Sequence, residues 1–161
     1  MFNGPFTEIL LVGLAALLLV AAVIDVRTFT ISNRLNLTVA LTAPLYWLSI
    51  ALPVWPDVGI QLAVGAGVFV LLAAAFYAGM MGGGDVKLAA ALVLWFPPAS
   101  IIPFLVLMSL AGGALTLVVL AWHRAKRREG RPEIPYGVAI ALGGLAILVP
   151  HLAQPFLNHF A

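Results

Sequence analysis

The chain has 161 residues, of which 63% are hydrophobic and 9% are charged, and its formal net charge is +2. A soluble globular domain has about 45–50% apolar and about 25% charged residues, so this composition excludes one. Cysteine is absent, which excludes disulfides, thiol nucleophiles and cysteine-ligated zinc. The basic residues lie in short connections between apolar runs, which indicates membrane orientation and argues against nucleic-acid binding.

Six apolar runs predict an all-α, polytopic membrane protein that forms a single domain over residues 1–161. The runs cover residues 6–26, 36–54, 58–79, 86–96, 101–122 and 136–152. A helix needs about 20 residues to cross a bilayer, and the first run meets this length. No lysine or arginine precedes that run, so it is predicted to be a retained helix and not a cleavable signal peptide.

The fourth run is short, and the double proline that follows it limits how far its helix extends. A helix over residues 86–96 is only about 16 Å long, too short to cross the membrane unaided. Two explanations remain open. The helix starts inside the membrane after a non-helical loop, or its end continues past Pro97 and Pro98.

All eight basic residues fall on one side of the membrane if the chain crosses it six times. They lie in the first connection, at the start of the fourth run and in the fifth connection: Arg27, Arg34, Lys87, Arg124, Lys126, Arg127, Arg128 and Arg131. The positive-inside rule therefore predicts that these connections are cytoplasmic and that both termini lie outside. The basic cluster between the last two runs also favours contact with anionic membrane lipid.

Tryptophans and small residues suggest how the helices sit and pack. Trp47, Trp55, Trp95 and Trp122 fall near the ends of predicted spans, where they are expected to act as interfacial anchors. Small residues such as Gly112 and Gly113 are expected to let helices pack closely in lipid.

Asp25 and Asp85 are acids at the junction between an apolar run and a cytoplasmic connection. A charged group at the centre of a span costs about 2.5–3.5 kcal/mol, so such residues are usually kept for pairing or function. Either one alone could be a solvated boundary charge or a partner of Arg27 or Lys87. Asp85 follows three glycines, which tolerate positive φ and let a chain or ligand come close to the carboxylate. A plain flexible turn is the alternative.

Two carboxylates at the same depth suit aspartic-protease chemistry. Carboxylates that lie close together share one proton, because like charges resist joint ionisation. The ionised one can take a proton from water while the neutral one protonates a carbonyl oxygen, and this needs no metal or other cofactor. We therefore expect neither a metal site nor a cofactor.

Three segments of the sequence resemble motifs of the type IV prepilin peptidases, which are GxGD-type intramembrane aspartic proteases. Residues 25–33 (DVRTFTISN) resemble the first aspartate motif of that family. Residues 82–88 (GGGDVKL) are similar to its GxGD motif, and residues 135–143 (PYGVAIALG) to its last motif. One position differs: Ser32 stands where many relatives carry proline, which predicts a looser turn.

The resemblance implies an endopeptidase that removes the basic leader of prepilins at the cytoplasmic face of the bacterial inner membrane. Asp25 and Asp85 would be the catalytic pair, and the GxGD loop would open the short fourth helix. The chain looks like the short, peptidase-only branch associated with tight-adherence (Flp-type) pili, because it lacks the cytoplasmic segment of relatives that also act as N-methyltransferases. Prepilins would be its substrates, and the pilus assembly machinery is a candidate partner.

Other residues of these motifs are expected to support the site. Gly82 and Gly84 would shape the loop, and Lys87 would orient it or contact the substrate. Arg27 and Asn33 would fix the first connection or the substrate backbone, whereas Tyr136 would line the active site. The substrate helix is expected along the first and fourth spans.

Two other functions fit the same acids. The first is a proton- or ion-coupled carrier in which the carboxylates act as a relay. The second is an assembly subunit of a secretion or pilus machine without chemistry of its own.

Overall fold

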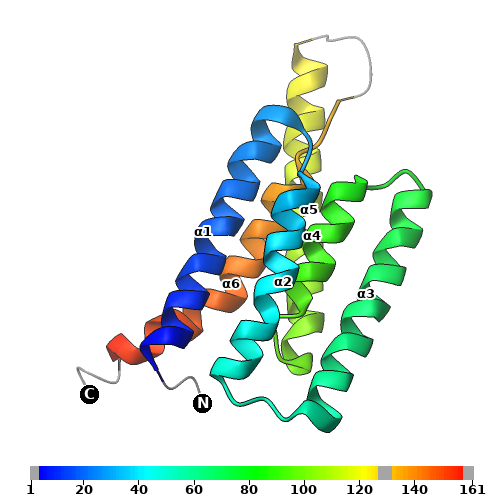
Figure 1. Ribbon diagram of the computed structural model, residues 1–161. Helices are drawn as coiled ribbons and strands as arrows, with labels where there is room; N and C mark the ends of the chain where they lie inside the picture. The colour runs from blue at the N-terminus through cyan, green and yellow to red at the C-terminus, as the bar shows by residue number, and fades with distance from the viewer. Residues whose placement is uncertain (1–3, 127–131, 158–161) are drawn as a thin grey trace.

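The computed structural model describes residues 4–126 and 132–157 and contains six α-helices and, in these residues, no strand, which confirms the all-α prediction (Figure 1). The helices are α1 (Pro5–Thr28), α2 (Asn33–Ser49), α3 (Gly59–Tyr77), α4 (Gly83–Val93), α5 (Ile101–Ala125) and α6 (Tyr136–Leu157). Two short helical turns, Val54–Val58 and Pro98–Ser100, precede α3 and α5. Each α-helix corresponds to one of the six apolar runs.

Three stretches are long and apolar enough to cross a membrane by themselves: Pro5–Thr28, Val54–Tyr77 and Pro98–Ala125. These stretches make the chain a membrane protein by length and composition. The count of six crossings and the sidedness of the termini stay predictions. Four residues of the predicted basic connection, Arg127, Arg128, Glu129 and Arg131, lie outside the described residues.

The helices form a bundle in which the predicted cytoplasmic connections gather at one end (Figure 1). The end of α1, the start of α2 and the start of α4 lie at this end, whereas the start of α1 and the end of α6 lie at the other (Figure 1). Helix α6 packs along α1 and α5, and α4 packs against α2, α3 and α6. This arrangement brings the ends of α1 and α4 that carry Asp25 and Asp85 to the same end of the bundle.

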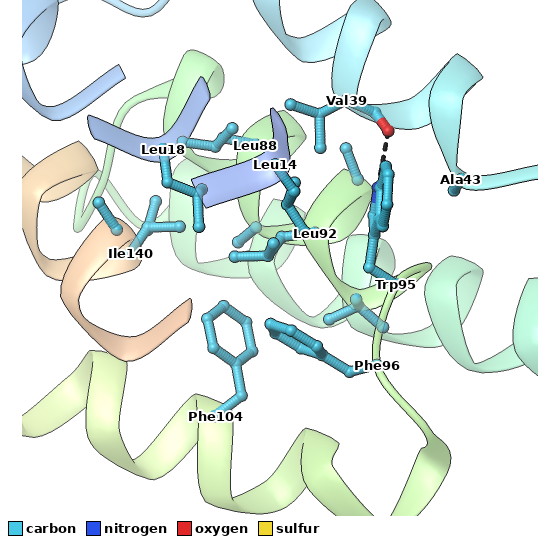
Figure 2. Close-up of a cluster of buried hydrophobic side chains, with 14 of the residues drawn as sticks. Leu14, Leu18, Val39, Ala43, Leu88, Leu92, Trp95, Phe96, Phe104 and Ile140 are labelled. Carbon is cyan, nitrogen blue, oxygen red and sulfur yellow. Dashed lines mark hydrogen bonds between the residues drawn. The ribbon is translucent and has the colours of Figure 1, made fainter. Parts of the chain in front are cut away.

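Helix α4 lies at the centre of the bundle and is short. Its end at Val93 shows that it does not continue past Pro97 and Pro98, so that alternative is wrong. A non-helical turn leads into its start at Gly83. Leu88 and Leu92 of α4 are fully buried and pack in one cluster with Leu14 of α1 and with residues of α5 and α6 (Figure 2). Burial of most of its side chains within the bundle therefore compensates for its short length.

Buried side chains satisfy the carbonyl groups at the end of α4. The Gln61 amide donates to the carbonyls of Val93 at 2.8 Å and Phe96 at 2.6 Å. The Trp47 indole donates to the carbonyl of Leu94 at 2.8 Å. A helix end that is buried away from water needs such donors, because its last carbonyls have no partner within the helix.

Two of the four tryptophans are structural and do not anchor the protein at the membrane surface. The Trp95 indole is buried and donates to the carbonyl of Val39 in α2 at 2.9 Å (Figure 2). Trp47 is buried as well, whereas Trp55 and Trp122 are exposed. The expectation of interfacial anchoring is therefore wrong for Trp47 and Trp95, whose N–H groups were needed inside the bundle.

Candidate active site

Asp25 lies in the last turn of α1 and is only 2% exposed. Its Oδ2 accepts a 2.6 Å hydrogen bond from the backbone amide of Gly137, in the first turn of α6. The first amides of a helix have no partner within it and carry partial positive charge, so they bind an acidic group well. Asp25 is thus fixed against the start of α6.

Asp85 lies in the first turn of α4 and is 8% exposed. Its Oδ2 accepts a hydrogen bond from the amide of Gly82 at 3.1 Å, the residue just before the helix. This is the side-chain half of a capping box, in which the third helical residue bonds back to the cap. Both carboxylates are therefore held by backbone amides at the starts of helices.

The connection between α1 and α2 lies between these two helix starts. Phe29 ends α1 in a left-handed conformation (φ 51°), and its amide donates to the carbonyl of Asp25 at 2.8 Å. The chain then turns so that Ile31 is buried against Gly84 and Gly137. The carboxylates of Asp25 and Asp85 are close enough across this junction for their like charges to repel each other.

Two of the three glycines before Asp85, Gly82 and Gly84, leave no space for a side chain, and none of the three is needed for its φ angle. A Cβ atom on Gly84 would lie 2.9 Å from the carbonyl oxygen of Ile31, and one on Gly82 would lie 2.8 Å from Oδ2 of Asp85. Gly83 differs, because its Cβ would make an ordinary contact of 3.4 Å with Phe76. None of the three has positive φ. Another segment of the chain does come close at Gly84, whereas the predicted use of positive φ is wrong. Close approach of a chain or ligand to the Asp85 carboxylate itself stays a prediction.

The structure places the predicted supporting residues in different surroundings. The Lys87 ammonium donates to Oδ1 of Asn33 at 2.9 Å, so these two join the start of α2 to α4. Arg27 is exposed and makes no hydrogen bond or ion pair within the part of the chain that is described. Tyr136 begins α6 next to Gly137, and its hydroxyl lies 3.4 Å from that of Thr116.

Ser32 begins α2 without the proline of many relatives. Its hydroxyl oxygen accepts a hydrogen bond from the Leu35 amide at 3.3 Å, and it is the N-cap of the helix. A serine cap satisfies one of the free amides of the first turn. The start of α2 is therefore held by a side-chain cap where a looser turn was expected.

Sequence reasoning missed Asn36, which is 4% exposed. Its side-chain amide donates to the carbonyl of Gly84 at 2.9 Å. Its Oδ1 is buried and has no hydrogen-bond partner among the described residues. The available signal was a polar residue inside an apolar run, three positions after Asn33, and therefore on the same helix face.

Neither arginine nor lysine contacts the two carboxylates in the residues described, so backbone amides are the polar groups found to hold them. Within residues 4–126 and 132–157, no three His, Cys, Asp or Glu side chains are grouped as metal ligands. Two buried carboxylates with one oxygen each fixed in place can hold and transfer a proton between them and a third group.

Comparison with known proteins agrees with the motifs. The profile of the type IV leader peptidase family matches residues 12–117, which include both acids. A curated relative, the prepilin leader peptidase/N-methyltransferase of Xanthomonas campestris pv. campestris, is 37% identical over 67 residues. That match covers 42% of this chain and 22% of the relative, so the chain aligns with about a fifth of the relative's length. No solved structure gives a significant match.

Proposed function

The chain belongs to the type IV leader peptidase family, and from this premise we propose that it is an aspartic endopeptidase that removes the leader of prepilins. The peptidase class follows from the family. Asp25 and Asp85 as the catalytic pair, and cleavage at the cytoplasmic face of the bacterial inner membrane, are our proposal. We also propose that the chain crosses the membrane six times and has both termini outside.

The observation that carries this proposal is the way the two carboxylates are held. They come from different helices, lie buried at the same end of the bundle and interact electrostatically. Each has its Oδ2 bonded to a backbone amide at the start of a helix. Preorganised amides of this kind fix the carboxylates, and within residues 4–126 and 132–157 no lysine or arginine contacts them.

The proposed reaction needs one ionised and one protonated carboxylate. The ionised carboxylate takes a proton from water, and this water attacks the carbonyl carbon of the scissile peptide bond. The protonated carboxylate gives its proton to the carbonyl oxygen. In the collapse of the tetrahedral intermediate the C–N bond breaks, and the leaving nitrogen takes the proton that the first carboxylate removed from water. A hydroxyl of the intermediate gives its proton back to the second carboxylate, so the pair again holds one proton.

We further propose that the substrates are prepilins of the tight-adherence (Flp) type and that the chain acts only as a peptidase. The name of the curated relative, with about a fifth of which the chain aligns, joins peptidase and N-methyltransferase activities. The carboxylates described above account for peptide hydrolysis and for no methyl transfer.

The test is cleavage of a detergent-solubilised prepilin by the purified protein. Wild type is expected to shorten the prepilin at a single site, with and without a chelator. Asp25→Asn and Asp85→Asn each keep the shape of the side chain and remove its ability to exchange a proton, so both are expected to abolish cleavage. Cleavage that survives both substitutions would exclude this pair as the catalytic groups.

A further inference from the structure

An apolar groove of about 590 Å³ lies beside the candidate active site. Its sides are formed by the last turns of α3 and by the middle of α5, and the first turns of α6 close it. Every residue that lines it is uncharged. We name it the α3–α5 groove.

The groove borders both carboxylates through their neighbours in the chain. Met81 and Tyr136 line it. Each directly precedes the glycine whose amide holds a carboxylate: Met81 precedes Gly82, and Tyr136 precedes Gly137. An occupant of the groove would therefore lie next to the starts of α4 and α6, whose amides hold the two candidate catalytic carboxylates.

The wall formed by α5 includes small and hydroxyl-bearing residues between Met108 and Leu117. Ser109, Gly113 and Thr116 follow one another along the groove. A Cβ atom on Gly113 would have no neighbour within 4 Å, so this glycine faces open space. Small residues in lipid let the backbone of another helix approach closely, and a hydroxyl group such as that of Ser109 can bond to it. The Thr116 hydroxyl already donates to the carbonyl of Gly112 at 2.7 Å. The opposite rim carries Met80 and Met81, whose flexible side chains adapt to varied partners.

We propose that the α3–α5 groove binds the apolar helix of the prepilin substrate and directs the adjoining cleavage site to Asp25 and Asp85. This inference rests on the proposed function. It places the substrate helix in a different location from the one expected from the sequence, which was along the first and fourth spans. On the face of α4 that packs against α1 and α6, Leu88, Ala89 and Leu92 are fully buried. Its more open face, with Lys87 and Ala90, borders a separate groove beside α2 and α3.

The first experiment fills the groove with Gly113→Phe and uses Gly13→Phe as its matched control. Gly13 is also an exposed helical glycine with no neighbour within 4 Å of an added Cβ, but it lies on α1 and outside the groove. Gly113→Phe is expected to raise the KM for prepilin at least about tenfold with an unchanged unfolding temperature. Gly13→Phe is expected to leave KM, kcat and unfolding temperature unchanged.

The second experiment identifies the occupant. A photo-crosslinking phenylalanine derivative at position 113, in the Asp85→Asn background that leaves prepilin uncleaved, is expected to capture the apolar segment of prepilin, whereas position 13 captures none. Capture of lipid alone at position 113, or wild-type KM for Gly113→Phe, would overturn the groove proposal. Absence of cleavage by wild type would instead overturn the proposed function, so the two failures are distinguishable.

Discussion

The amide of Gly137 donates a 2.6 Å hydrogen bond to Oδ2 of Asp25, although 112 positions separate these residues in the sequence. Atoms of Ile31 and Asp25 fill the space around Gly137. A Cβ atom on Gly137 would lie 2.8 Å from the same oxygen and 2.7 Å from Cδ1 of Ile31. The first turn of α6 can therefore approach the carboxylate this closely only with glycine at position 137.

Gly137→Ala should disable the site even though it adds only a methyl group. An exposed helical glycine normally gains about 0.5–1 kcal/mol of stability on replacement by alanine. Here the methyl group would push α6 away from Asp25, so kcat is expected to fall about 100-fold or more, because misplacement by about 1 Å has effects of that size. Cleavage kinetics and thermal unfolding in detergent measure both effects.

The control is Gly67→Ala, at a position in α3 where an added Cβ would meet nothing within 4 Å. This variant should cleave prepilin at the wild-type rate and unfold at the same or a higher temperature. Wild-type kcat for Gly137→Ala would show that the contact between α6 and Asp25 is dispensable.

The three glycines before Asp85 should respond differently to alanine. Gly84→Ala forces the backbone at Ile31 to move, and Gly82→Ala displaces the Asp85 carboxylate, so each is expected to lower kcat about 10- to 100-fold. Gly83→Ala is the internal control and should keep near-wild-type activity, because its Cβ makes an ordinary contact. Equal losses for all three would indicate that the loop needs flexibility more than space.

The sequence was enough to predict the helices and to single out Asp25 and Asp85, because both depend on local patterns. Apolar runs of sufficient length identify spans whatever they pack against, and an acid at a span end is conspicuous by its cost. These patterns placed Asp25 and Asp85 at one end of the bundle. The structure has them in the last turn of α1 and the first turn of α4, which lie at the same end (Figure 1).

Features that depend on packing between helices could not be predicted. Trp95 has the composition and position of an interfacial anchor, but its indole is buried because the Val39 carbonyl in another helix needs a donor. The reason for glycine at position 84 is the backbone of Ile31, which is 53 positions away in the sequence. Asn36 was missed for the same reason, since its partner is the Gly84 carbonyl.

Lys87 and Asn33 should have small effects, because they join two helices without touching the carboxylates. Their hydrogen bond is exposed, and such bonds contribute less than about 1 kcal/mol. Lys87→Met and Asn33→Ala are each expected to change kcat only a few-fold. The double variant should be no worse than the poorer single variant, since each substitution breaks the same bond. Additive losses would instead assign Lys87 or Asn33 a separate contact with substrate.

We expect the Asn36 side chain to lower the stability of the protein and to support its activity. A buried acceptor without a partner costs about 1–3 kcal/mol, and the hydrogen bond to Gly84 returns only about 1 kcal/mol. Leucine has nearly the same shape and no polar atoms to bury. Asn36→Leu is therefore expected to be at least as stable as wild type. Its kcat should fall at least about tenfold, because the turn that carries Asp85 loses a tether.

Gln61→Leu is the matched control for Asn36→Leu, and we expect it to have the opposite effects on stability and activity. Gln61 is also a buried amide that bonds to α4, but it serves the far end of that helix, at Val93 and Phe96. Its loss leaves carbonyls without a donor in an apolar interior, so the unfolding temperature should fall while kcat for prepilin stays within about twofold of wild type. A merely structural Asn36 would instead behave as Gln61 does, with lower stability and unchanged kcat, and that result would remove Asn36 from the site.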